Sequence, residues 1–334
     1  MWSKCLFSLI ALSFFSIAQA QAIPERSFEF RITPSNPGPG EEVRIFADTF
    51  SFDATRAETT WRVNGEVVEE GNGIREITVQ MGEFGDPLTI EFSATRGTQS
   101  INQTRTILPS LLDLVVEPQT YAPALYPGGT KVTHESPMRI TAIPTFISPE
   151  GSPYASEDIV FTWREGTQVL QGQSGRGAQT ALIDASTLAR SKEIVVDAAT
   201  VDNAFSVRER ISIRPQEPEL LFYEDKPLLG IDFSTALAAS SDLDGEEVTI
   251  VAEPFFVPGQ ARGELPVEYT WRLNNESVAS GNEDGGTLTL RQAGQGRGRA
   301  LVNLSVQHVD ELLIRAENAL RVTFGSESPG IFGL

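Results

Sequence analysis

Three stretches of the chain carry the same short pattern: residues 60–65 read Thr-Trp-Arg-Val-Asn-Gly, residues 162–166 read Thr-Trp-Arg-Glu-Gly, and residues 270–275 read Thr-Trp-Arg-Leu-Asn-Asn. Their tryptophans, Trp61, Trp163 and Trp271, are separated by 102 and 108 residues. A unit of about 100 residues is large enough to fold alone, whereas solenoid repeats are about 20 to 50 residues long. The recurrence therefore predicts three copies of one domain.

The segments around these tryptophans alternate between apolar and polar residues. Residues 28–32 place Phe, Phe and Ile at every second position, and residues 88–92 place Leu, Ile and Phe in the same way. The same period of two occurs in residues 159–163, 267–273 and 320–324. This alternation is typical of antiparallel strands with one buried face.

Turn-forming residues separate the alternating segments. Residues 34–40 read Pro-Ser-Asn-Pro-Gly-Pro-Gly, and Asn64 and Gly65 are the strongest hairpin signal in the chain, because both residue types tolerate a positive φ. The chain shows no long helical period. We expect a short turn or helix only at residues 184–192 and 310–319.

These features predict an all-β chain: three tandem immunoglobulin-like β-sandwich domains after an N-terminal signal peptide. A tryptophan on a central strand, followed by a hairpin, is typical of that sandwich. We therefore expect Trp61, Trp163 and Trp271 to be structural core residues. Aliphatic neighbours must fill the space that a disulfide occupies in antibody domains.

Proline-marked joints give the expected domain boundaries. Residues 107–109 read Ile-Leu-Pro, and residues 213–215 read Ile-Arg-Pro. The predicted organisation is a signal peptide at 1–20, immunoglobulin-like domains at 24–109, 111–215 and 217–325, and an apolar C-terminal tail at 326–334.

The first twenty residues have the layout of a secretory signal peptide. Lys4 precedes an apolar run over residues 6–17, and residues 18–20 read Ala-Gln-Ala. The run is shorter than the roughly 20 residues that a membrane span needs, although a retained anchor is the alternative. We expect cleavage after Ala20, which would remove Cys5 and leave a mature chain with no transmembrane segment. The protein would then be extracellular, at the cell surface or periplasmic.

The composition excludes several kinds of chemistry. Cys5 is the only cysteine, and His134 and His308 are the only histidines, so disulfide frameworks, structural zinc clusters and multi-histidine metal sites are excluded. We expect His308 to lie in a solvated loop or at a strand end. The formal net charge of −19 argues against nucleic acid as a partner. Because the chain has no Gly-x-Ser-x-Gly elbow, and no other reactive motif, we expect no enzymatic activity.

Residues 216–334 carry the strongest charge bias, with 8 basic and 19 acidic residues. Within them, Asp242, Asp244 and Glu246 lie around Gly245. Calcium prefers carboxylate oxygens, so these three residues are the candidate metal ligands. An acidic surface turn is the alternative, and we predict no other cofactor.

The last residues of the chain, 328–334, read Ser-Pro-Gly-Ile-Phe-Gly-Leu. An apolar segment of this kind can add to the sheet edge of another protein, so Ile331, Phe332 and Leu334 are candidate partner-binding residues. Packing of the tail on the last domain is the alternative.

One resemblance rests on the first repeat. Residues 39–43 read Pro-Gly-Glu-Glu-Val and open the strand before Trp61, which itself begins a Trp-x-x-Asn-Gly turn. Together they resemble bacterial immunoglobulin-like and PKD-like surface modules, and residues 23–107 match best. All three repeats lack the PKD signature Trp-x-Phe-Gly-Asp-Gly, which favours a generic immunoglobulin-like sandwich.

A second resemblance covers nearly the whole chain after the signal. Residues 219–224, 227–231 and 324–334 are similar to segments of uncharacterised exported proteins from reduced-genome bacteria. The resemblance implies an association with the cell surface and with pilus or secretion apparatus, and it transfers no catalytic residue.

The sequence therefore predicts a non-enzymatic exported scaffold or adhesion-type protein that acts through contacts with envelope or surface proteins. The alternative is a secreted carbohydrate-binding or glycan-hydrolysing β-sandwich protein. Glycoside hydrolysis requires only two carboxylates at a set separation, and the chain is rich in acidic residues.

Overall fold

A computed structural model of the chain describes residues 28–50, 52–124, 126–185, 189–243, 247–282, 284–294 and 298–324. This part of the chain consists of β-strands and loops with four single-turn 3-10 helices, η1 (Ala54–Arg56), η2 (Ser156–Asp158), η3 (Gln171–Gln173) and η4 (Arg262–Glu264). None of the helices among these residues has the length and apolar character that a membrane crossing needs. The predicted signal peptide lies outside the described residues.

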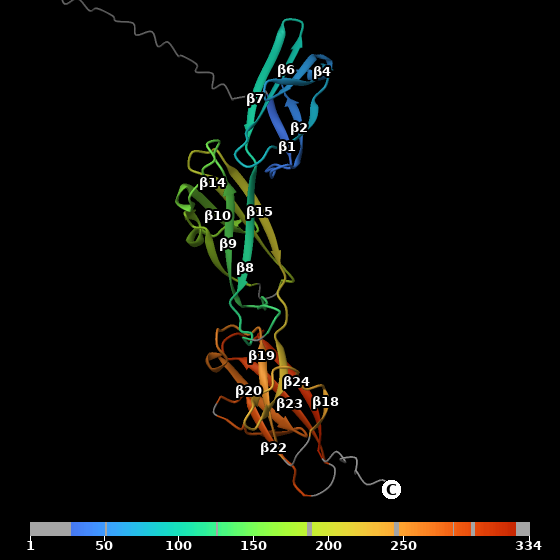
Figure 1. Cartoon of the computed structure of the whole chain (residues 1–334), viewed down its shortest axis with the longest axis vertical. Coiled ribbons are helices and arrows are strands. Elements are labelled where there is room, and N and C mark those ends of the chain that lie inside the picture. The colour runs from blue at the N-terminus through green and yellow to red at the C-terminus, as the bar shows by residue number, and fades with distance from the viewer. Residues whose placement is uncertain are drawn as a thin grey trace, which may run out of the picture. The chain divides into compact units, whose positions relative to one another are not determined.

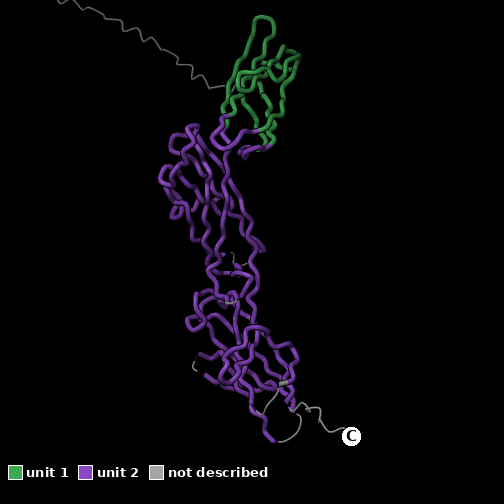
Figure 2. Tube along the Cα trace, viewed as in Figure 1, with its two compact units in different colours: residues 1–34, 42–80, 88–107 green, residues 35–41, 81–87, 108–334 purple. Residues whose placement is uncertain are grey.

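The chain forms two compact units (Figure 2). Of the described residues, the first unit holds 28–34, 42–80 and 88–107, and the second holds 35–41, 81–87 and those from 108 onwards. The first unit contains one β-sandwich and the second contains two, as the strands in Figure 1 show. The predicted fold class is therefore confirmed: the chain is a tandem array of β-sandwiches.

The first sandwich packs a three-stranded sheet, β1-β2-β5, on a four-stranded sheet, β4-β3-β6-β7. The strands are β1 (Phe28–Thr33), β2 (Glu42–Thr49), β3 (Glu58–Val63), β4 (Glu66–Asn72), β5 (Glu76–Gln80), β6 (Leu88–Arg96) and β7 (Gln99–Ile107). Trp61 and Phe92 are buried between the sheets, and the ring centroids of Phe30 and Trp61 are 6.0 Å apart.

The second sandwich repeats this arrangement with the sheets β8-β9-β13 and β11-β10-β14-β15, and β12 pairs with β10. The strands are β8 (Ser110–Pro118), β9 (Pro137–Phe146), β10 (Ile159–Glu165), β11 (Gln168–Val169), β12 (Gly175–Arg176), β13 (Thr180–Asp184), β14 (Lys192–Thr200) and β15 (Ser206–Ile213). Trp163, Phe161 and Phe146 lie in its buried core.

The third sandwich consists of the sheets β17-β16-β19-β22 and β18-β24-β23-β20-β21. The strands are β16 (Glu219–Lys226), β17 (Gly230–Ile231), β18 (Ser240–Leu243), β19 (Glu247–Phe255), β20 (Val267–Leu273), β21 (Glu276–Val278), β22 (Thr287–Arg291), β23 (Gly298–His308) and β24 (Arg315–Phe324). Trp271, Phe222 and Leu304 lie in its core.

The strand order is the same in all three sandwiches. The first, second and fifth main strands form one sheet in each, and the third, sixth and seventh form the other, with the fourth, which follows the tryptophan strand, at its edge. The separation of strands one, two and five from strands three, six and seven is that of the immunoglobulin fold, although the fourth strand of a constant-type domain lies in the first of these sheets. The third sandwich adds β18, which pairs in parallel with β24.

Each tryptophan makes the same polar contact. The indole Nε1 donates to a backbone carbonyl two residues before the fifth main strand: Trp61 to Ile74 at 3.1 Å, Trp163 to Ala178 at 2.8 Å and Trp271 to Gly285 at 2.7 Å. The bond joins the central strand of one sheet to the segment that leads into the opposite sheet. Its loss would cost free energy of folding, because the buried indole N–H would have no partner.

The hairpin after the first tryptophan has the predicted geometry. Asn64 and Gly65 both have positive φ, at 50° and 87°, and the two residues alone connect β3 to β4. Positive φ at both positions defines the turn whose twist matches the strands. Asn274 and Asn275 form the same turn in the third sandwich.

One expected helix is a strand. The predicted turn or helix at residues 310–319 is wrong from Arg315 onwards, since Arg315–Phe324 is β24. This segment pairs with β23 over its whole length and buries Ala316 and Leu320, so pairing within the sheet overrides the local sequence preference.

The second and third sandwiches meet at a junction built from the connection between β8 and β9. Phe256 N donates to Tyr121 O and Tyr121 N donates to Val257 O, both at 2.7 Å. Thr133 Oγ1 donates to the Phe256 carbonyl at 3.0 Å. Tyr126 packs on the rings of Phe255 and Phe256, so the end of β19 is buried on both of its faces.

Candidate functional site

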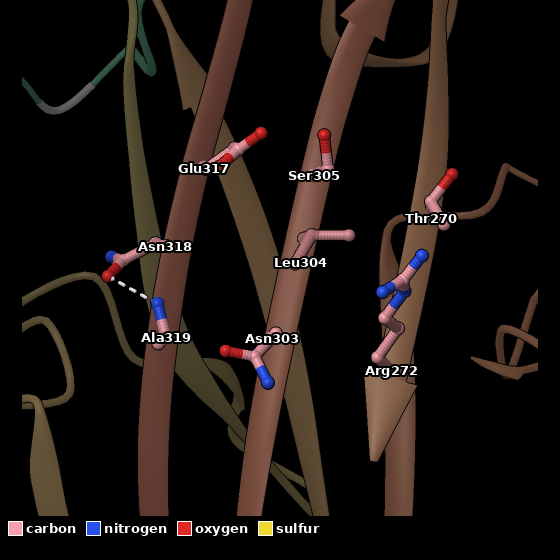
Figure 3. A pocket seen from close by; sticks show the side chains of 8 residues that line it. All are labelled: Thr270, Arg272, Asn303, Leu304, Ser305, Glu317, Asn318 and Ala319. Atoms are coloured by element: carbon pink, nitrogen blue, oxygen red, sulfur yellow. Dashed lines mark hydrogen bonds between the residues drawn. The ribbon is translucent and has the colours of Figure 1, made fainter. Parts of the chain in front are cut away.

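The candidate site is an open hollow on the outer face of the third sandwich (Figure 3). It measures about 640 Å³ and lies over β20, β23 and β24, the three long strands of one sheet. Side chains alternate between the two faces of a strand, so burial of Trp271, Leu304 and Leu320 in the core turns their neighbours outward.

Strand register arranges the outward side chains in rows. Two rows form the hollow, Thr270 with Ser305 and Glu317, then Arg272 with Asn303 and Ala319. Figure 3 shows these residues on three adjacent strands, with the Arg272 side chain lying over β20. Ala319 contributes only a methyl group to the second row, so the surface of the sheet is hollowed at this position.

The polar side chains of the hollow have no intramolecular partner within the described part of the chain. Thr270, Arg272, Asn303, Ser305 and Glu317 form no side-chain hydrogen bond and no ion pair there. Asn318, at the rim, donates to the Leu220 carbonyl at 2.6 Å. A guanidinium, a carboxylate, an amide and two hydroxyls are therefore available to a ligand.

A second polar group lies buried at the junction. Glu253 is fully buried; it accepts from the Tyr121 hydroxyl and pairs with Arg262, whose Nε lies 3.1 Å from its Oε2. Burial raises the pKa of Glu253, whereas the Tyr121 hydroxyl and the Arg262 charge lower it. Burial also raises the pKa of Tyr269 nearby to about 12. Because Tyr121 belongs to the connection between β8 and β9, its bond to Glu253 ties that connection to the third sandwich.

The predicted calcium ligands are only partly described. Asp242 lies on β18 and is exposed, whereas Asp244 and Glu246 lie outside the described residues. The part of the chain that the structure describes holds no group of three His, Cys, Asp or Glu side chains that could bind a metal ion. Calcium binding at Asp242, Asp244 and Glu246 stays a prediction, as does partner binding by Ile331, Phe332 and Leu334, which also lie outside the described residues.

The three tryptophans and His308 are structural in this fold. Trp61, Trp163 and Trp271 are buried in the three cores. His308 ends β23 as expected, but its side chain is buried rather than solvated. Its Nδ1 accepts the backbone N–H groups of Asp310 at 3.2 Å and Glu311 at 3.0 Å, which closes the turn before β24.

Sequence reasoning missed the hollow, although the repeats contain a signal for it. Asp197 follows Trp163 by 34 positions, and Ser305 follows Trp271 by the same distance. The two residues occupy equivalent places, opposite Thr162 and Thr270. An aligned pair of repeats would therefore show that the third repeat lacks the acid that the second has.

Fold and site define a class of protein: a tandem array of immunoglobulin-like β-sandwiches with an open polar face on its third sandwich. No protein-family model matches the chain, and no curated protein matches its sequence.

Several solved structures resemble the chain. A structure of Sidekick-1 immunoglobulin domains 1–5 is 12% identical, with 90% of this chain and 60% of that chain covered and a TM-score of 0.30. The central fibronectin-III array of RIM-binding protein is 12% identical, with 89% and 96% covered and a TM-score of 0.30. Three N-terminal domains of the bacteriophage RB49 highly immunogenic outer capsid protein are 14% identical, with 89% and 97% covered and a TM-score of 0.24.

Proposed function

We propose that this chain is a non-enzymatic exported protein that acts as a scaffold or adhesion-type protein through contacts with other proteins of the cell envelope or surface. Export rests on the signal-peptide layout of residues 1–20. An association with pilus or secretion apparatus rests on the resemblance of residues 219–224, 227–231 and 324–334 to exported proteins.

The observation that carries the proposal is the form of the hollow. Sites for small molecules are enclosed clefts that bury most of the ligand. The hollow at Arg272 and Asn303 is instead an open depression on a sheet face, with polar side chains free of intramolecular partners in the described part of the chain. A broad, open, hydrogen-bonding surface suits the face of another protein.

The junction supports a scaffold role. Its backbone hydrogen bonds, its aromatic cluster and the buried Glu253 link the second and third sandwiches through contacts that are expensive to break. A scaffold requires that its modules keep a fixed geometry, and this junction supplies contacts suited to that task.

Site-specific photo-crosslinking in the producing cell tests the proposal. A photo-reactive residue at Ala319, in the hollow, should yield discrete protein adducts that mass spectrometry identifies, whereas the same residue at Thr98, exposed in the turn between β6 and β7 of the first sandwich, should yield none. N-terminal sequencing of the recovered chain should begin at Gln21.

A hit on a glycan array or in a glycosidase panel, together with no protein adduct from Ala319, would replace the proposal with the carbohydrate alternative.

A further inference from the structure

The basic residues of the third sandwich divide into two groups. Lys226, Arg262 and Arg291 each form an ion pair with an acidic residue. The structure describes four other basic residues between 217 and 324, which are Arg272, Arg299, Arg315 and Arg321. These four form no ion pair and no side-chain hydrogen bond with any described residue.

All four unpaired arginines lie on the outer face of one sheet. Register places Arg272 in the row of Asn303 and Ala319, Arg321 in the next row with Leu301, and Arg299 in the row after that. Successive rows are about 6.7 Å apart, because each row advances two residues along a strand. Arg315 lies at the other end of the face, in the row of Glu268.

The acidic residues of this sandwich are mostly elsewhere. Of the fifteen acidic residues described between residues 217 and 324, only Asp242, Glu268 and Glu317 belong to these rows. Among the described residues between 217 and 324, this face thus carries more than half of the basic side chains and a fifth of the acidic ones. Positive charge is concentrated here within the most acidic part of the chain.

On the equivalent face of the second sandwich, the arginines form ion pairs with acidic residues of the same face. Arg164 and Arg208 both pair with Asp197, and Arg210 pairs with Glu193 at 3.4 Å. Ser305 replaces Asp197 in the third sandwich, and Glu317 replaces Arg208. The third face therefore has the arginine of the repeat without its acid.

We propose that the arginine face, defined by Arg272, Arg299 and Arg321, binds an acidic segment of a partner protein. Each planar guanidinium presents paired N–H donors that match a carboxylate, and arginine is enriched at the energetic centres of protein interfaces. Charge complementarity identifies the partner as acidic. This inference rests on the proposed function and deepens it by naming the surface and the chemistry of the partner.

A protein segment fits the face better than an acidic glycan does. The described rows contain no aromatic side chain on which a sugar ring could stack, whereas Leu301 and Ala319 offer apolar contacts between the arginines. An extended peptide places alternate side chains on one face about 6.7 Å apart, which is also the spacing of the rows.

Peptide binding to the full chain tests the proposal. The probe is a fluorescent peptide of six Glu-Ser repeats, its control is a peptide of six Gln-Ser repeats, and an oligogalacturonate of twelve residues represents an acidic glycan. Anisotropy is measured at 50 and 300 mM NaCl, because a charge-based contact weakens with salt.

Matched variants separate the arginine face from bulk charge. The test variant carries Arg272→Ser, Arg299→Ser and Arg321→Ser. The control carries three serine substitutions at exposed arginines that are ion-paired in this fold, Arg44, Arg139 and Arg176. Circular dichroism establishes that both variants unfold as the parent does.

The proposal expects the parent and the control to bind the Glu-Ser peptide, and the test variant to bind at least tenfold more weakly. Absence of binding by the parent, equal losses in both variants, or arginine-dependent binding of the oligogalacturonate in preference to the peptide would each overturn it. If Ala319 still crosslinks to a protein in any of those cases, the proposed function stands and only this inference fails.

Discussion

The second and third sandwiches share a core and differ on one face. Both bury the tryptophan of the Thr-Trp-Arg repeat and anchor its indole N–H to a carbonyl before the fifth main strand, at 2.8 Å for Trp163 and 2.7 Å for Trp271. On the outer face, Arg164 has an acidic partner in Asp197, whereas Arg272 has none among the described residues. Two domains can therefore keep one fold while only one of them presents free charges to a partner.

The largest expected effect concerns what the two sandwiches share. Trp163→Ala and Trp271→Ala should each lower the free energy of unfolding of their sandwich by about 3–5 kcal/mol, through lost burial and the cavity that remains. Urea unfolding followed by circular dichroism measures both. A loss below about 1 kcal/mol for one tryptophan only would show that the cores are not equivalent.

The next effect contrasts a buried ion pair with a partly exposed one. Glu253→Ala should cost about 2–3 kcal/mol, because it leaves Arg262 and the Tyr121 hydroxyl without their partner at the junction. Asp197→Ser should cost about 1 kcal/mol, since solvent screens the pair with Arg164. Equal losses in thermal unfolding would contradict the assignment of Glu253 to the junction.

An exchange of residues should move the free arginine from one sandwich to the other. Ser305→Asp with Glu317→Arg copies the row Thr162-Asp197-Arg208 into the third sandwich, while Asp197→Ser removes the acid from the second. Binding of the Glu-Ser peptide should fall in the first variant, although its net charge becomes more positive. Unchanged or stronger binding would attribute the contact to bulk charge rather than to a free guanidinium.

The smallest effect is a pH dependence at the junction. Because the pKa of Glu253 is raised above its unfolded value of about 4.3, its ionised form is disfavoured in the fold. The parent should therefore lose stability relative to Glu253→Gln as pH rises from below 4.3 through the raised pKa. Midpoints of urea unfolding at pH 4, 6 and 8 give the difference, and an opposite slope would show that Arg262 outweighs burial.

The parts of the fold that were predictable are those with a local signal. Alternation located the strands around Trp61, Trp163 and Trp271, and Asn64 with Gly65 marked a hairpin, because both signals arise within a few residues. Alternation also marked the second half of β24, residues 320–324. Its first half, residues 315–319, was missed because pairing with β23, rather than local composition, determines its structure.

The junction and the hollow were not predictable from one pass along the sequence. Tyr121 and Glu253 are 132 positions apart, and no local pattern connects them. The hollow depends on register between β20, β23 and β24, which brings Arg272 opposite Asn303. The sequence signal for the hollow is seen only when the repeats are compared, because Ser305 takes the place of Asp197.

Arginine side-chain NMR tests the contrast between the two faces most directly. The Hε–Nε resonances of the full chain, assigned by single substitutions, are followed while the Glu-Ser peptide is added. We expect the resonances of Arg272, Arg299 and Arg321 to shift with the peptide, while those of the ion-paired Arg164, Arg208 and Arg210 do not. Equal shifts on both faces, or shifts confined to the second sandwich, would contradict it.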